Sequence, residues 1–281
     1  MPLNDFEGLR ERYELLTAQS RLVDAVLAPP GSELAAMAPA GVTPLAGIKG
    51  GLDRALQAYR THASVLADRA LTAIYPRLRE RMEAHAEGSF AALAWSCWRG
   101  NAPTQSDLGD WGEVLIGRLE RSRQEDGLPA AWVAIARMEW ALHRIERQPD
   151  AGPDLSSLAL LGRLPPAALR LTLSDLAVLQ RCDVPELAEV AALPEEACGD
   201  GPRVALMVWR EGWKGAVIAL DLPTLRWCEA LCDGVDLERA LMAAGPHFDF
   251  SAWLPAAVRR GWLARVESVD LAPVHPFKSA R

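Results

Sequence analysis

The segment 147–157, RQPDAGPDLSS, divides the sequence into two halves with different residue patterns. It is polar and rich in Pro, Gly and Asp, which is typical of a connection between domains. Before it, apolar residues recur at three-to-four spacing, as they do in helices. Beyond it, short alternating or continuous apolar runs indicate strands. The sequence therefore predicts a mainly α protein with an α+β C-terminal domain, divided into domains at 1–150 and 158–281.

The first half is expected to be a helical domain. A stretch with several Pro and Gly residues, APPGSELAAMAPAGVTPLAGIKGG, follows the first predicted helix and is interpreted as a loop or linker. The short connections after it favour a compact antiparallel bundle. Helices are predicted at 5–27, 51–62, 63–74, 77–86, 87–99, 106–122 and 129–147.

The second half contains a hairpin pattern. The runs RVALMVWR (203–210) and GAVIAL (215–220) are strand-like and are joined by the four residues EGWK. Asp221 and Asp236 are plausible helix caps, and Gly234, Gly245 and Gly261 are natural helix stops. Strands followed by three short helices and a last strand describe a winged-helix-like domain. The remaining elements are predicted at 168–173 and 262–268 for strands, and at 222–233, 236–244 and 250–260 for helices.

The bulk composition limits the classes of protein to consider. Half of the residues are hydrophobic, which is enough for one large or two ordinary cores, and the formal net charge of −7 argues against a binder of nucleic acid or anionic membrane. The five cysteines are scattered and form no CxxC pair, so neither a disulfide framework nor a zinc ribbon is indicated. No run of apolar residues approaches the length of about 18 that a membrane-spanning helix needs. The first residues also lack the apolar core of a signal peptide. We expect a soluble, cytoplasmic protein.

Two pairs of residues could begin a metal site. Glu139 and His143 lie four apart in VAIARMEWALHRIE, and Cys228 and Cys232 lie four apart in the helix predicted at 222–233. A di-iron bundle needs two Glu-x-x-His units and two more glutamates. A metal ion held by two thiolates needs two further ligands. A metalloenzyme is therefore one alternative, but structural roles are favoured: Glu139 as a paired carboxylate, and the cysteines as small core residues. No cofactor is expected in this chain.

A transcription factor is the other alternative, because a winged helix fused to a helical domain is common in that class. Its recognition helix would be SAWLPAAVRRG. A helix that reads bases should present Arg, Lys, Asn or Gln, with phosphate-binding cations on either side. This segment offers only Arg259 and Arg260, and acidic residues outnumber basic ones in the second half of the chain. Both features disfavour a winged-helix DNA-binding regulator.

Several segments together resemble a known family. ALQAYRTHASVLADRALTAIYPRLRERMEAHAEGSFAALAWSCW is similar to its order of helix, Tyr-Arg, helix, aromatic-Pro and Phe-containing helix. APTQSDLGDWGEVL resembles its Pro–Ser–Leu–Gly segment, and IARMEWALHRIE resembles its Ala-x-x-Glu-Trp helix, here with Glu139 and Trp140. This is the HvfC/BufC-type family, whose N-terminal domain is labelled a putative DNA-binding domain and which includes the methanobactin-biosynthesis partner protein. The resemblance covers about 50–147 and, more loosely, 168–268; His62 stands where the family often has Asn.

The resemblance implies a non-catalytic role. Such proteins form a heterodimer with an iron-dependent TIM-barrel enzyme that modifies cysteines in a ribosomally synthesised precursor peptide, a RiPP, and the iron belongs to the enzyme. The C-terminal domain would be a peptide recognition element that binds the leader peptide as an added strand. The helical domain would dock the partner enzyme. The resemblance implies no nucleic acid and no membrane as partners.

Candidate residues follow from these expectations. An exposed strand edge offers unpaired N–H and C=O groups that a leader peptide can bind, and 215–220 is the candidate edge. A helix beside it is the candidate groove wall, although these residues could equally cover the sheet. The leader-binding candidates are Ala216, Val217, Ile218, Ala219, Leu220, Trp253, Leu254 and Val258. The candidates for the partner interface, or else for the framework and hairpin packing, are Tyr59, Arg60, Tyr75, Trp209 and Trp213, whereas Glu139 and Trp140 are interpreted as structural.

Overall fold

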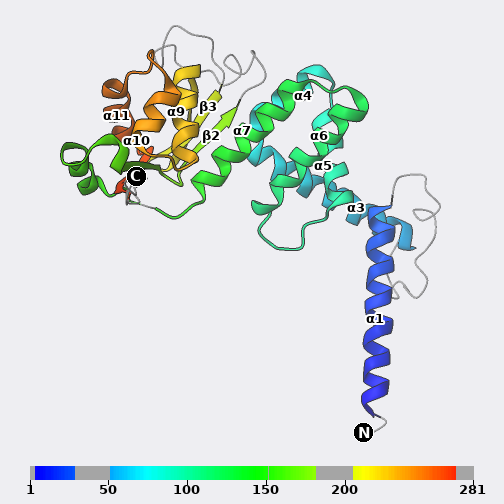
Figure 1. Cartoon of the computed structure of the whole chain (residues 1–281). Coiled ribbons are helices and arrows are strands. Elements are labelled where there is room, and N and C mark those ends of the chain that lie inside the picture. The colour runs from blue at the N-terminus through cyan, green and yellow to red at the C-terminus, as the bar shows by residue number, and fades with distance from the viewer. Residues whose placement is uncertain (1–3, 29–50, 151, 182–204, 270–281) are drawn as a thin grey trace, which may run out of the picture. The chain divides into compact units, whose positions relative to one another are not determined.

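The computed structural model describes residues 4–28, 51–150, 152–181 and 205–269. The described chain is mainly helical, and its strands form two small antiparallel sheets in the C-terminal region (Figure 1). This confirms the predicted class, mainly α with an α+β C-terminal region. The chain divides into two compact units, Met1–Arg121 and Ser122–Arg281.

The regular elements of the first unit, within its described residues, are all helices. The predicted helices at 51–62 and 63–74 form one continuous helix, because no Gly or Pro interrupts the chain between them. Pro76 takes the first turn of the next helix, where its missing N–H costs nothing. The elements are α1 (Asn4–Leu27), α3 (Gly51–Ile74), α4 (Pro76–His85), α5 (Ser89–Gly100), η1 (Asp110–Glu113) and α6 (Val114–Asp126), the last of which runs into the second unit.

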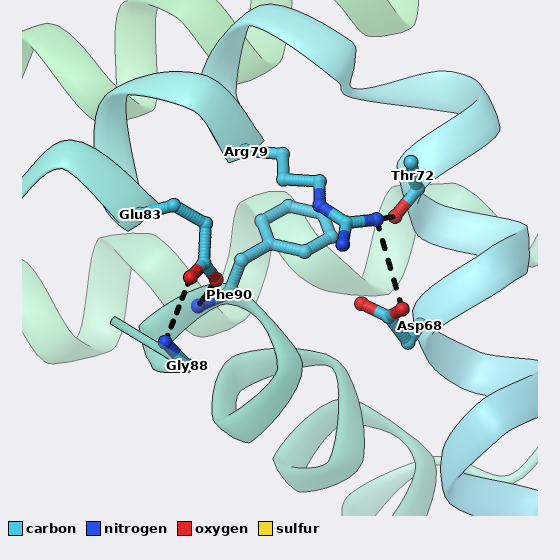
Figure 2. Close-up of polar contacts among 6 residues, drawn as sticks. All are labelled: Asp68, Thr72, Arg79, Glu83, Gly88 and Phe90. Atoms are coloured by element: carbon cyan, nitrogen blue, oxygen red, sulfur yellow. Dashed lines mark hydrogen bonds and ion pairs between the residues drawn. The ribbon is translucent and has the colours of Figure 1, made fainter. Parts of the chain in front are cut away.

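A carboxylate, rather than a conventional capping residue, holds the start of α5. The residue before α5 is Gly88, with φ at 76°, and it has no side chain to cap the helix. Glu83 instead accepts hydrogen bonds from the backbone N–H groups of Gly88 at 2.7 Å and Phe90 at 3.1 Å (Figure 2). Beside it, Arg79 donates to the Thr72 hydroxyl at 2.6 Å and lies over the Phe90 ring. This network fixes the turn between α4 and α5.

Replacing Glu83 by alanine is expected to lower the free energy of unfolding by about 1–2 kcal/mol. The substitution leaves the first N–H groups of α5 without an acceptor, which is the loss expected on removing a helix cap. Urea denaturation followed by circular dichroism measures the change. Glu80→Ala is the matched control, because Glu80 is an exposed acid on the same helix. Equal stabilities of the two variants would contradict the capping role.

The second unit combines helices with both sheets. Strands β1 and β5 pair with each other, and β2, β3 and β4 form a three-stranded sheet in that order. The four predicted strands are confirmed within one or two residues at each end, whereas β2 was not predicted. The elements are α7 (Ala130–Glu146), η2 (Leu155–Gly162), η3 (Pro166–Ala168), β1 (Leu169–Leu173), β2 (Ala177–Arg181), β3 (Ala205–Glu211), β4 (Lys214–Leu220), α9 (Leu222–Cys232), α10 (Leu237–Ala244), α11 (Phe250–Arg259) and β5 (Leu263–Ser268).

The division between the units differs from the predicted boundary at 147–157, because α7 packs on the sheet of the second unit. The side-chain amide of Gln180 in β2 donates to the Ala134 carbonyl of α7 at 3.2 Å. At the other end of the helix, the buried guanidinium of Arg210 in β3 donates to the Gln148 carbonyl and pairs with Asp150. The polar segment is therefore a connection inside the second unit, and the division falls within α6.

Strand β3 is buried on both faces, which explains its nearly continuous apolar sequence. Met207 and Trp209 point into a core built with the C-terminal helices, whereas Leu206 and Val208 alternate with them and point to the opposite face. The centre of that core is aromatic. The fully buried Trp227 of α9 has ring centroids within 4.8–5.4 Å of Phe248, Phe250 and Trp253.

The predicted helix starts and stops in this unit are confirmed. The carboxylates of Asp221 and Asp236 accept the N–H of Thr224 and Arg239, both at 2.9 Å, and so cap α9 and α10. The predicted stop residues Gly234, Gly245 and Gly261 follow α9, α10 and α11 and all have positive φ.

Candidate functional site

The outer side of β4 is the candidate site, and we call it the β4 edge. β4 lies at one margin of the β2-β3-β4 sheet. The N–H of Gly215 points away from β3, because it donates to Oε1 of Glu146 at 2.7 Å. Alternate residues of a paired strand direct their backbone groups to the same side. Val217 and Ala219 therefore also point their N–H and C=O groups outward, whereas Ala216 and Ile218 bond to β3.

Two other strand margins in the described part of the chain are occupied at some of their residues. Two outer groups of β5 are bonded to residues at the start of η2: the Ala264 carbonyl accepts from the Asp154 N–H, and the Val266 N–H donates to the Ser157 hydroxyl. On β2, the outward N–H of Ala177 donates to the Ser174 carbonyl. Proteins commonly cover strand margins in this way to prevent unwanted pairing. Within the described residues, no partner is recorded for the outward N–H of Val217.

Only the first part of the β4 edge is accessible. Gly215, Ala216 and Val217 are partly exposed, but Ile218, Ala219 and Leu220 are buried. Ile218 and Leu220 point into the helical core, opposite Met207 and Ala205. The predicted leader-binding strand is thus corrected from the whole of 215–220 to its first residues.

Helix α7 approaches this accessible part so closely that any side chain larger than hydrogen would force Leu142 to shift. A Cβ added at Gly215 would lie 2.5 Å from Cδ2 of Leu142 and 3.3 Å from both the Leu142 Cβ and Oε1 of Glu146. Leu142 and Glu146 are one turn apart on α7, so they line the same side of the β4 edge. The site therefore consists of outward backbone groups, an apolar side chain and a carboxylate.

Gly215→Ala is expected to lower the free energy of unfolding by about 1–3 kcal/mol, because the added methyl group overpacks the contact with Leu142. The double variant Gly215→Ala/Leu142→Ala should be less destabilised than the sum of the two single variants, since the smaller side chain makes room. Chemical denaturation gives all four stabilities. Gly162→Ala is the control, as nothing lies within 4 Å of its added Cβ. Strict additivity would contradict the proposed contact.

The tip of the β3–β4 hairpin carries an exposed tryptophan. Gly212 has φ at 63° and makes the turn, and the next residue, Trp213, is 81% exposed. Trp209 in the same hairpin is buried: its ring lies 5.4 Å from Trp262 in an edge-to-face arrangement, and the Arg260 guanidinium lies over both rings. Trp209 is therefore a core residue, which corrects its prediction as an interface residue, whereas Trp213 is placed where a partner can reach it.

The predicted groove wall on α11 is also corrected. Trp253 is buried among the aromatic rings around Trp227, so its side chain does not line an accessible groove. Leu254 and Val258 are partly buried and pack against the same core. These three residues support the fold and do not extend the β4 edge.

The docking candidates of the first unit have three different environments. Tyr59 is 62% exposed on α3. Arg60 donates to the carbonyls of Ala25 and Val26, where it caps the C-terminal end of α1. Tyr75 is fully buried and its hydroxyl donates to the Gly112 carbonyl at 2.8 Å. Arg60 and Tyr75 thus hold the framework, the alternative left open by the sequence, and the prediction of Tyr75 as an interface residue is wrong.

The residues considered for metal chemistry are placed as follows. Glu139 and Trp140 are buried in α7, and the His143 ring stacks on Trp140 at 5.5 Å. Cys228 is buried and Cys232 exposed on α9. Across the described ranges, no group of three or more His, Cys, Asp or Glu side chains is arranged to hold a metal ion. Cys182 and Cys198 lie outside those ranges.

Cys97 is a poor nucleophile despite neighbouring cations. Burial raises the pKa of its thiol to about 12, although Arg118 and Arg121 act in the opposite direction. The reactive thiolate is therefore scarce at neutral pH. For Cys232, partial burial and the adjacent carboxylates of Asp233 and Glu229 also raise the thiol pKa. Neither thiol has the lowered pKa that is typical of a catalytic cysteine.

Sequence reasoning missed Glu146 and the close contact at Gly215. A signal for Glu146 was present: it is an acidic residue in the last turn of α7, where the helix dipole disfavours negative charge. Such a residue suggests a hydrogen-bond donor from outside the helix. The Gly215 contact has no comparable signal, because it depends on how α7 crosses the sheet.

No protein-family model matches the chain, and no curated protein matches it. Among the described helices, none is long and apolar enough to cross a membrane.

Proposed function

We propose that this chain is a non-catalytic partner subunit that binds the leader of a ribosomally synthesised precursor peptide and presents its cysteine to an iron-dependent TIM-barrel enzyme. The observation that carries the proposal is the β4 edge, whose outward groups at Val217 have no recorded partner among the described residues. The resemblance of 50–147 to the HvfC/BufC-type family supports the identity of the enzyme and of its peptide. The iron belongs to the enzyme, and the pair acts in the cytoplasm.

Strand addition gives the edge a binding mechanism. A peptide laid along Gly215–Val217 bonds through its own backbone, so affinity comes from main-chain groups and specificity from side chains beside Leu142. The order of hairpin, three helices and final strand supports a winged-helix-like arrangement, with the hairpin as the wing. In this arrangement residues 158–281 provide most of the peptide-recognition domain, and α7 contributes Leu142 and Glu146.

Docking of the enzyme requires exposed anchors. Trp213 and Tyr59 are the exposed aromatic residues among the predicted interface positions. Large aromatic side chains that become desolvated on binding commonly dominate interface energetics. Each unit then offers a docking anchor of its own, Tyr59 on the helical region and Trp213 at the hairpin tip.

A role in reading DNA receives less support. Of the two arginines at the end of α11, Arg260 lies over the Trp209 and Trp262 rings, at 5.6 and 5.0 Å from their centroids. An arginine held in this way is not positioned to read a base edge. Arg259 is left as the exposed cation of that helix end.

Co-expression of the tagged chain with its chromosomal neighbours tests the proposal. We expect a stable heterodimer whose iron is in the partner, and which retains a small ribosomal peptide detectable by mass spectrometry. A chain that carries its own stoichiometric metal, or one that ignores both proteins and peptides but shifts DNA, would overturn the proposal.

A further inference from the structure

Glu146 occupies one of the outward donors of the β4 edge. Its Oε1 accepts the Gly215 N–H at 2.7 Å, the position that the carbonyl of an added strand would take. Gly215 and Val217 are the outward-facing residues of the accessible part of β4. We infer that Glu146 is an edge cap: its carboxylate closes the β4 edge in the free chain, and a bound peptide strand must replace it at Gly215. This inference rests on the proposed function.

The cap removes a large part of the available site. A strand added along Gly215–Val217 can bond to the N–H and C=O groups of both outward residues. While Glu146 holds the Gly215 N–H, the accessible edge offers the groups of Val217 and the carbonyl of Gly215. The cap thus shortens the exposed edge of the free chain, which also limits pairing with unintended strands.

The cap can leave without moving α7. Glu146 is exposed and ends the helix, where the helix dipole disfavours its negative charge. The helix itself is held by other contacts: Leu142 packs against Gly215, and Arg210 donates to the Gln148 carbonyl. Rotation of one side chain is therefore enough to open the Gly215 N–H to a peptide.

The ligand that would bind the β4 edge is defined by its backbone groups. The group that replaces the carboxylate is a peptide carbonyl, so the ligand is an extended segment with N–H and C=O groups free to pair at alternate residues. We assign this role to the strand of the precursor's leader. The peptide residue that pairs with Gly215 cannot be proline, because proline lacks the backbone N–H that would bond to the Gly215 carbonyl.

The test uses a displayed library of random 12-residue peptides, selected on the full wild-type chain. Selected peptides are then titrated against wild type, Glu146→Gln, Glu146→Ala and the control Glu125→Ala, which removes an exposed acid on α6. Removing a competing charge-assisted bond should tighten binding roughly tenfold in Glu146→Ala. Glu146→Gln, which keeps a neutral acceptor, should fall between it and wild type, and Glu125→Ala should match wild type.

The results that would overturn the inference differ in what they imply for the proposed function. Peptides that lose binding in Val217→Pro but bind wild type and Glu146→Ala equally would refute the cap and leave strand addition standing. A selection that yields no peptide sensitive to Val217→Pro would refute both. Faster amide exchange at Gly215 in the free Glu146→Ala chain, measured by NMR, is also expected, and unchanged exchange would count against the cap.

Discussion

Val217→Pro is expected to abolish peptide retention while the chain stays folded. The Val217 N–H points away from β3, so proline removes a donor for the added strand but no hydrogen bond of the sheet itself. The residue before it, Ala216, is already in extended backbone, which proline permits. Binding of selected peptides, or of the co-purified precursor, should fall at least tenfold, the loss expected from about one and a half kcal/mol of hydrogen bonding.

Ala216→Pro is the matched control for this experiment. Ala216 lies opposite Trp209 and gives its N–H to β3, so proline at this position removes a ladder bond and should cost about 3 kcal/mol or more of folding free energy. Circular dichroism and urea denaturation report the fold of both variants. A folded Val217→Pro chain that still retains the peptide would show that β4 does not receive it.

Trp227→Ala is expected to have the largest effect on stability, lowering the free energy of unfolding by about 3–5 kcal/mol. The indole is fully buried at the centre of the aromatic core, against Phe248, Phe250 and Trp253. Truncation leaves a cavity lined by rigid rings that cannot collapse to fill it. Trp227→Phe should cost less, because it keeps a ring and removes an indole N–H that has no hydrogen-bond acceptor among the described residues.

Trp213→Ala provides the comparison for this prediction. Its side chain is the exposed tryptophan at the hairpin tip, so its removal should change stability by less than about 0.5 kcal/mol. Urea titrations followed by far-ultraviolet circular dichroism avoid the change in fluorescence caused by losing a tryptophan. Equal effects at the two positions would contradict the assignment of Trp227 to the core and Trp213 to the surface.

Local patterns in the sequence predicted most of the elements. The hairpin was predicted from two apolar runs and a short turn, and the caps at Asp221 and Asp236 from residue type alone. β2 was missed because AVLQR is short and alternates weakly, and its pairing with β3 joins residues far apart in sequence. The continuous helix α3 was divided in two, although no Gly or Pro separates its halves.

Long-range packing explains the domain division and the extent of the site, which the sequence did not predict. The segment at 147–157 has the composition of a linker, yet Arg210, Gln180 and Gly215 tie α7 to the sheet, so the helix belongs with the strands that follow it. None of these contacts has a periodic signal. The same limit explains the site: the sequence indicated an edge at 215–220, but which half is accessible depends on the helices that cover Ile218 and Leu220.

The two hairpin tryptophans show that sequence patterns also failed to predict the burial of single residues. Trp209 and Trp213 are four apart and equally apolar, so composition offered no reason to separate them. Trp209 alternates with Met207 and therefore points into the helical core, whereas Trp213 follows the turn at Gly212 and points to solvent. Strand register, which the sequence alone did not settle, places one in the core and the other on the surface.

Co-purification tests the central claim most directly. The tagged wild-type chain and its Val217→Pro variant are each expressed with the neighbouring genes, and the eluted proteins, peptide and iron are quantified. We predict that both chains bring down an iron-containing enzyme and that only the wild type retains the precursor peptide. Equal peptide retention by both chains, or the absence of any enzyme and peptide with the wild type, would contradict the account.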